Sequence, residues 1–173
     1  MRYLVVLIAL FFVLYSCKSS KSTYTITKNP SGNKSLAKAL TVPASGKNAE
    51  DVIHSAKKYL GTPYKYSGMD RSGMDCSGLI CQAFNDVGVN LPHQSAEQSK
   101  LGKSVSLKDL KPGDLIFLGA TKGSDKITHV GMVVKVDNGK IIFIHSSTKK
   151  GVIEENLLEK WYQPLFIKGA RLF

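Results

Sequence analysis

Cysteine is scarce in this chain, which holds only Cys17, Cys76 and Cys81. An odd number cannot pair completely within one chain, so each cysteine needs its own explanation. Cys76 and Cys81 lie in one stretch with helical spacing, which puts their Cα atoms roughly 8–9 Å apart, too far for an undistorted disulfide. We expect Cys81 to be a buried structural thiol.

Two kinds of ligand motif are also missing. No group of Cys and His residues has the spacing of metal ligands. No glycine-rich loop leads from a strand into a helix in a nucleotide-binding pattern. We therefore expect neither a metal nor a cofactor.

Acidic residues are absent from residues 17–47, which contain six lysines, whereas residues 48–173 carry a net charge of +4. The basic character thus belongs mainly to a tail, which argues against a nucleic-acid-binding domain. It permits attraction to anionic lipid or to an anionic cell-wall polymer. We expect no nucleic-acid partner, and we expect a monomer.

The N-terminus is typical of a secretory signal, with Arg2 followed by an apolar run over residues 3–14 that is short for a membrane span. The run ends in Leu-Tyr-Ser-Cys at 14–17, which resembles the bacterial lipobox. That resemblance implies a signal peptide over residues 1–16 and lipid on Cys17; an uncleaved anchor helix or an ordinary signal peptide are the alternatives. The second residue after Cys17 is Ser19 and not Asp. If the cell is Gram-negative, the lipoprotein sorting pattern then implies the outer membrane, facing the periplasm.

Residues 18–47 are rich in Lys, Ser, Thr and Asn and poor in apolar residues. Such a composition predicts a flexible tether rather than a domain. As a flexible coil it would span roughly 30 Å, which lets an anchored domain search a nearby layer.

The folded domain is predicted over residues 48–173, with helices first and antiparallel strands later, an α+β pattern. Apolar spacing predicts a helix from 48 to 60 and another from 76 that ends at Gly88. Asn138-Gly139 predicts a hairpin turn. Further elements are predicted as short helices at 95–101 and 156–161 and strands at 115–118, 128–136, 140–146, 151–154 and 165–173.

Cys76 is predicted at the first turn of its helix, directly after Asp75. Unpaired backbone N–H groups and the positive end of the helix dipole favour a thiolate there, so Cys76 is a candidate nucleophile. The alternative is a small buried apolar residue. Asp75 is expected to cap the helix, with an additional substrate contact possible in principle.

Two histidines lie on the strands joined by the predicted hairpin. His129 opens the first strand and His145 closes the second, so an antiparallel pairing brings them together if a bulge or a wider loop absorbs a mismatch of a few residues. A cysteine nucleophile needs a base, and the base needs an orienting partner. We predict His129 as the base and His145 as its orienter; His54 is expected to have a surface or packing role.

Six spaced blocks resemble the NlpC/P60 family of cell-wall cysteine peptidases, above all its small lipoprotein members that act as murein endopeptidases. They are Gly-Thr-Pro-Tyr-Lys-Tyr-Ser-Gly at 61–68, Asp-Cys-Ser-Gly-Leu at 75–79, Leu-Pro at 91–92 with Gln98, Pro-Gly-Asp-Leu at 112–115, His-Val-Gly-Met at 129–132 and Ile-His-Ser-Ser at 144–147. The resemblance implies a papain-like fold in which Cys76, His129 and His145 form the catalytic set.

It also implies a transition-state role for Tyr64, whose hydroxyl would join the Cys76 N–H in an oxyanion site; a packing role is an equal alternative. Asp75 and Ser77 are candidates for substrate contacts. The sequence departs from the family pattern after Leu-Pro, where His93 and Gln94 stand. We rank His93 low as a base because it lies in a turn with no evident partner.

The resemblance implies a lipid-anchored endopeptidase of the cell envelope, which hydrolyses amide bonds in peptidoglycan stem peptides or cross-links during cell-wall remodelling. A related amidase or acyltransferase with the same site is one alternative. A non-catalytic cell-wall-binding lipoprotein is the other, and the complete Cys-His-His set counts against it.

Overall fold

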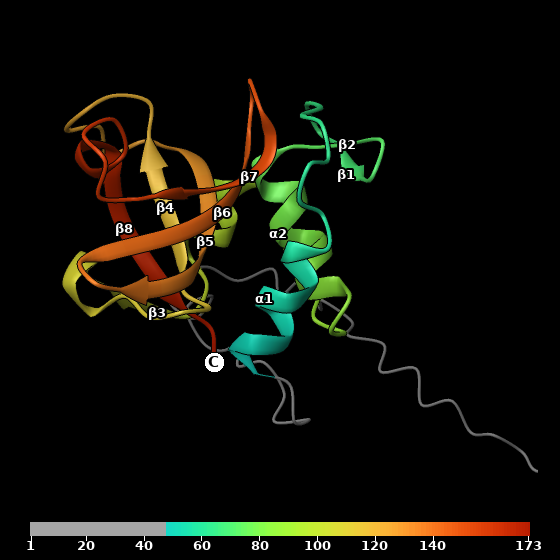
Figure 1. Ribbon diagram of the computed structural model, residues 1–173, viewed down its shortest axis with the longest axis horizontal. Coiled ribbons are helices and arrows are strands. Elements are labelled where there is room, and N and C mark those ends of the chain that lie inside the picture. Colours follow the sequence, from blue (N-terminus) through green and yellow to red (C-terminus); the bar gives the residue numbers. More distant parts are fainter. Residues whose placement is uncertain (1–47) are drawn as a thin grey trace, which may run out of the picture. The chain divides into compact units, whose positions relative to one another are not determined.

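The computed structural model describes residues 48–173, which combine helices with a six-stranded antiparallel sheet (Figure 1). The helices are α1 (Ala49–Lys57), α2 (Cys76–Asn85) and α3 (Ser95–Gln98), with short 3-10 helices at Leu107–Asp109 and Gln163–Leu165. The sheet runs in the order β3 (Lys103–Val105), β8 (Phe166–Arg171), β4 (Leu115–Gly119), β5 (Ile127–Asp137), β6 (Lys140–Ser147) and β7 (Gly151–Asn156). This confirms the predicted α+β class.

The first helix begins where the sequence places a capping residue. Asn48 accepts a hydrogen bond from the Asp51 backbone N–H, and the Asp51 carboxylate accepts one from the Asn48 N–H, a capping box. The helix ends at Lys57, earlier than predicted, and turns lead to Gly61, whose φ of +80° suits a glycine. Among the described helices, none combines the length and the apolarity needed to cross a membrane.

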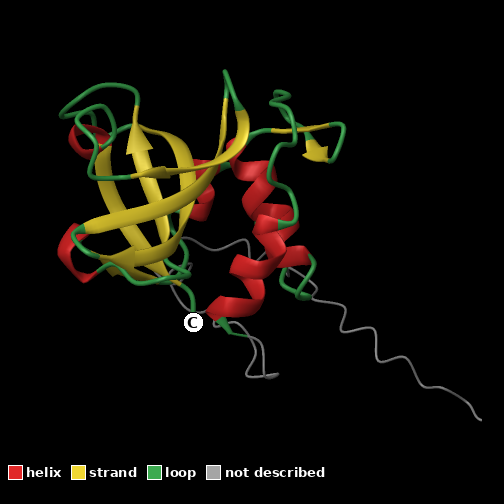
Figure 2. Cartoon of the chain, in the orientation of Figure 1, coloured by secondary structure: helices red, strands yellow, loops and turns green. Residues whose placement is uncertain are grey.

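Apolar side chains fill both faces of the sheet. On one face, Val130 and Met132 of β5 pack with Leu79, Ile80 and Phe84 of α2, in a cluster that also includes residues of α1. Figure 2 shows α1 and α2 lying together on this side of the curved sheet.

On the other face, a second cluster includes Val133, Phe143 and Leu157. Because successive strand residues point to opposite faces, β5 contributes to both clusters. This arrangement holds α2, and Cys76 at its start, against the strands that carry the histidines.

The β5–β6 hairpin turns at Asn138 and Gly139, as predicted, and both residues have positive φ. The pairing shifts between Val133 and Lys135, so one extra residue is accommodated in β5. The predicted bulge is therefore present, and it sets how far His129 lies from His145 along the ladder.

Several local predictions differ from the structure. The short helix at 156–161 is wrong: β7 continues to Asn156, and turns follow, because the Asn156 side chain accepts hydrogen bonds from the Ile141 and Leu158 N–H groups. A small hairpin of β1 (Met69–Asp70) and β2 (Gly73–Met74) was not predicted, and neither was strand β3. The helix predicted at 95–101 ends at Gln98. The predictions for residues 1–47, including lipid on Cys17, lie outside the described residues.

Candidate active site

Cys76 is the first residue of α2, and Asp75 is the N-cap that fixes it there. Asp75 Oδ1 accepts hydrogen bonds from the Gly78 N–H at 2.6 Å and from the Ser77 hydroxyl at 3.0 Å. Its Oδ2 accepts one from the Ser67 N–H at 2.9 Å. The predicted cap is confirmed, and the same carboxylate ties the preceding loop to the helix start.

The loop approaches the first turn of α2 so closely that only glycine fits at position 78. A Cβ at Gly78 would lie 2.0 Å from the backbone oxygen of Gly68. The Asp-Cys-Ser-Gly pattern thus has a steric reason as well as a chemical one, because the loop before the nucleophile and the helix after it share one packed junction.

Cys76 packs against the core cluster that includes Val130, the residue next to His129 on β5, and the backbone of Val130 acts to lower the pKa of the thiol. The thiol is therefore held beside the strand that carries the predicted base. Burial raises the pKa of Cys76, and this outweighs the lowering by the N–H groups of Val130, Ser77 and Cys76 itself. The prediction that the helix terminus favours a resting thiolate is wrong in its net direction, because desolvation of the charged form is the larger effect.

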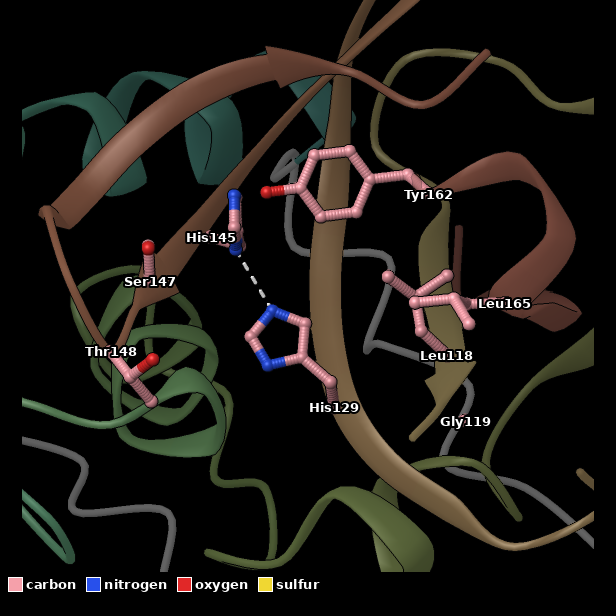
Figure 3. A pocket seen from close by; sticks show the side chains of 8 residues that line it. All are labelled: Leu118, Gly119, His129, His145, Ser147, Thr148, Tyr162 and Leu165. Atoms are coloured by element: carbon pink, nitrogen blue, oxygen red, sulfur yellow. Dashed lines mark hydrogen bonds between the residues drawn. The ribbon is translucent and has the colours of Figure 1, made fainter. Parts of the chain in front are cut away.

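The two histidines are hydrogen-bonded to each other. His129 Nε2 lies 2.9 Å from His145 Nδ1, and the rings meet edge to face (Figure 3). Burial lowers the pKa of both rings; the neighbouring His145 lowers that of His129 further, while Glu155 partly offsets the effect at His145. Both imidazoles are thus neutral at neutral pH, and Nδ1 of His129 points away from His145 (Figure 3).

His145 makes a second contact that the sequence reasoning missed. Its Nε2 lies 3.0 Å from Glu155 Oε2 on β7, and the same carboxylate oxygen accepts a hydrogen bond from the Tyr162 hydroxyl. Lys150 donates to the other oxygen, Oε1, at 3.0 Å. Side chains of β7 alternate between the two faces of the sheet. This alternation places Glu155 near His145 only when the pairing of β7 with β6 is known.

A cavity of about 190 Å³ gives access to the histidine pair. It is lined by both rings and by Ser147, Thr148 and Tyr162, among others (Figure 3). The pair is therefore not sealed inside the protein.

Tyr64 lies on the loop before α2 and forms an isolated parallel β-bridge with Met74. Burial raises the pKa of its hydroxyl, and the ionised forms of Cys76 and Asp75 raise it further. Cys76 thus influences the pKa of Tyr64, and the oxyanion role of Tyr64 stays a prediction. Ser77 is buried with its hydroxyl bound to Asp75.

His93 has a partner that the sequence analysis did not identify. Its Nε2 lies 3.0 Å from Asp75 Oδ1, so the expectation of a partnerless turn residue is wrong. The contact places His93 in the cap of α2, whereas Gln94 is exposed at the start of α3.

Cys81 is buried and free, and its thiol contacts the backbone oxygens of Leu91 and Pro92 at 3.4 and 3.3 Å. Burial raises its pKa to about 11. Both observations confirm a structural thiol. Within residues 48–173, no cluster of three or more His, Cys, Asp or Glu residues is arranged to hold a metal ion.

Comparison with known proteins agrees with this geometry, since residues 61–171 match the NlpC/P60 family. The chain belongs to this family. It is 32% identical over 173 residues to the probable endopeptidase NlpC of Escherichia coli, covering 99% of this chain and 100% of that one. It is 36% identical over 145 residues to a gamma-D-glutamyl-L-lysine dipeptidyl-peptidase of Bacillus subtilis, covering 82% of this chain and 48% of the relative.

Among solved structures, the NlpC/P60 domain of the peptidoglycan hydrolase SagA matches with a TM-score of 0.60 and 28% identity, covering 72% of this chain and 99% of that one. The chain thus spans about half the length of the Bacillus subtilis relative. The fold and the family predicted from the six sequence blocks are confirmed, and the site has the parts of a cysteine peptidase of the NlpC/P60 type.

Proposed function

We propose that this NlpC/P60 protein is a lipid-anchored cysteine endopeptidase that hydrolyses amide bonds in peptidoglycan stem peptides or their cross-links. One observation carries the proposal: Cys76 packs against the core cluster that includes Val130, the residue next to His129, and the His129 ring is hydrogen-bonded to His145. This arrangement of α2, β5 and β6 supports the proposed roles of nucleophile, base and orienter. The printed names of the relatives, an endopeptidase and a peptidoglycan hydrolase, supply the substrate class.

The first half of the reaction forms an acyl-enzyme. The Cys76 sulfur attacks the carbonyl carbon of the amide while Nδ1 of His129 takes the thiol proton. The negative charge on the carbonyl oxygen is stabilised by the Tyr64 hydroxyl and the Cys76 N–H. The carbon–nitrogen bond then breaks, and His129 gives its proton to the leaving amine.

The second half releases the acid. A water molecule attacks the thioester carbon while His129 takes one of its protons, and the carbon–sulfur bond breaks as the thiol regains a proton. Because the resting pair is a neutral thiol and a neutral imidazole, proton transfer accompanies attack in both halves. The hydrogen bond to His145 holds the His129 ring in place throughout.

Digestion of purified murein tests the proposed activity. Mass spectrometry of the products should show new amino and carboxyl ends inside stem peptides or cross-links, with wild-type protein and with Cys81→Ala but not with Cys76→Ala. Release of whole stem peptides from the sugar would instead identify an amidase. Unchanged murein with all three proteins would overturn the proposal.

The lipid anchor has its own test. Cys17→Ser removes the sulfur that the lipobox-like segment would present for lipid attachment, so the protein should move from the membrane fraction to the soluble fraction. Its activity on murein in solution should match that of the wild type. Equal membrane retention of the two proteins would overturn the anchoring proposal.

A further inference from the structure

We propose that Glu155 is a positioning residue that sets the tautomers of both histidines, so that His129 presents an unprotonated Nδ1 to Cys76. The inference rests on the proposed peptidase function. It adds to the predicted site a carboxylate and its supporting hydroxyl, Tyr162.

Strand pairing places Glu155 where it can reach His145. In the β6–β7 ladder His145 pairs with Ile153 and Phe143 pairs with Glu155, so Glu155 is the diagonal neighbour of His145 on the same face. The His145 side chain is only 3% exposed and stacks on Phe143 with ring centroids 4.5 Å apart. A ring held in this way can change its contacts only by moving its proton from one nitrogen to the other.

Glu155 is ionised at neutral pH. Burial alone would raise the pKa of Glu155, but the hydrogen bonds from Tyr162, Lys150 and His145 together lower it. An ionised carboxylate only accepts hydrogen bonds, so the 3.0 Å contact requires a proton on Nε2 of His145.

That proton determines the rest of the chain of hydrogen bonds. A neutral imidazole carries one proton, so protonated Nε2 leaves Nδ1 of His145 as an acceptor. The 2.9 Å contact then requires His129 to donate from its own Nε2. Nδ1 of His129 is left without a proton, which is the state that can accept one from Cys76.

Without a carboxylate the pair has a second arrangement. His145 can donate from Nδ1 to Nε2 of His129, which places the remaining His129 proton on Nδ1 and removes the base. In the protein, this arrangement would aim the lone pair of His145 Nε2 at the Glu155 carboxylate, and the two would repel. Glu155 therefore selects the productive arrangement.

Tyr162 and Lys150 support the carboxylate from two other segments. The Tyr162 hydroxyl donates to Oε2, the oxygen that faces His145, and meets the His145 ring edge to face with centroids 5.6 Å apart. Lys150 donates to Oε1, with 65% of its side chain exposed. We expect Tyr162 to matter more than Lys150, because an exposed ion pair contributes little.

Nitrogen-15 NMR of protein labelled in its histidines tests the tautomers without any substrate. In the wild type at neutral pH, His129 and His145 should each show a protonated Nε2 and an unprotonated Nδ1. Glu155→Gln should give a mixture, because an amide can donate as well as accept. A protonated Nδ1 on His145 in the wild type would overturn the inference, whatever the enzyme proves to cleave.

Kinetics on a cross-linked muropeptide provides the second readout. Glu155→Gln should lower kcat about 10- to 100-fold, as loss of an outer partner does for metal-ligating histidines. KM should change less than about 2-fold, because KM alone rises only when a mutation removes binding that is equal in the ground and transition states. Tyr162→Phe should give a smaller loss of kcat in the same direction.

Glu154→Gln is the matched control. It also removes one negative charge from β7, but Glu154 forms its ion pair with Lys57. It should match the wild type in tautomers and kcat. A Glu155→Gln variant with wild-type kcat overturns the positioning role. So does one with reduced kcat and wild-type tautomers, since the loss would then be only structural.

Discussion

His93 Nε2 lies 3.0 Å from Asp75 Oδ1, so a histidine from the loop after α2 helps to hold the cap of the helix that carries Cys76. Asp75 also accepts hydrogen bonds from Gly78, Ser77 and Ser67. Burial acts to raise the pKa of Asp75, but the hydrogen bonds from Gly78, His93 and Ser77 outweigh it and lower that pKa. The cap thus has several donors, of which His93 is one.

The first prediction follows from the presence of several hydrogen-bond donors to Asp75. His93→Ala removes one of the donors, so the activity on murein should fall less than about 10-fold, which corresponds to about 1.4 kcal/mol. Asp75→Ala removes the acceptor of every one of these bonds and should destabilise the protein by about 0.5–2 kcal/mol or more, as loss of an N-cap does. Rates and thermal unfolding of both variants decide the matter. A folded but inactive His93→Ala would show that His93 takes part in proton transfer.

The second prediction separates the two thiols of the described domain. Cys76→Ala should abolish activity and Cys76→Ser should nearly do so, because a hydroxyl is far harder to ionise than a thiol. Cys81→Ala should keep most activity, since the Cys81 thiol contacts only structural groups, among them the Gln98 side chain. Murein digestion with the three variants, and iodoacetamide labelling of each, measure this. An active Cys76→Ala beside an inactive Cys81→Ala would reverse the assignment of the nucleophile.

The third prediction divides the work between the histidines. His129→Ala should be inactive, because the thiol would have to ionise unaided and the leaving amine would lack a proton donor. His145→Asn should keep measurable activity, since an amide oxygen can still accept the His129 hydrogen bond, and His145→Ala should fall between the two. Steady-state rates on purified murein test the order once circular dichroism has shown that each variant is folded. Greater activity in His129→Ala than in His145→Ala would contradict it.

Sequence alone located much of this site. Asp75, followed by Cys76 and by apolar residues at helical spacing, predicts a capped helix with the cysteine at its start. The Asn138-Gly139 turn predicts the hairpin that pairs the histidine strands. These signals are local, because a cap and a two-residue turn each depend on neighbours within a few positions.

The parts that sequence missed depend on pairing between distant segments. Glu155 contacts His145 only because β7 pairs with β6 in one particular register, and a shift by one residue would turn its side chain to the other face. Tyr162 reaches the same carboxylate from a segment that sequence assigned next to a helix. His93 follows α2 in the chain, yet it contacts Asp75, which precedes that helix. None of these contacts has a local sequence signature.

The fourth prediction concerns pH. Burial lowers the pKa of His129 and His145 below the ordinary value of 6.5, so both stay neutral as the pH falls to that value. Activity should therefore decline only below about pH 6.5. Stability follows the same sign: the unfolded histidines take up protons below about pH 6.5 while the folded ones resist, so the stability present above this pH is lost as the pH falls further.

Rates and urea unfolding measured from about pH 8 to pH 5 check both statements. His54→Gln is a suitable control, because His54 is exposed on α1. An acid limb of activity at or above pH 6.5 would show that the resting pair is not neutral.

The last prediction concerns the salt bridge between β8 and the turn before β4. Arg171 on β8 donates from Nε to Asp114 Oδ1 at 2.8 Å and from Nη2 to Oδ2 at 2.7 Å. The Asp114 side chain is only 1% exposed, whereas that of Arg171 is 31% exposed. The pair therefore compensates a carboxylate that water reaches poorly, through two parallel hydrogen bonds.

Arg171→Met keeps the apolar stem but leaves Asp114 with the Lys111 N–H as its remaining donor. The free energy of unfolding should fall by about 2–3 kcal/mol, the upper range for hydrogen bonds to charged groups. Adding Asp114→Asn should recover part of this loss, because the buried charge is then removed as well. Arg71→Met, an exposed residue over the Tyr59 ring, should lower it by less than about 1 kcal/mol. Urea unfolding of the four proteins tests the order, and a loss in Arg171→Met no larger than in Arg71→Met would contradict it.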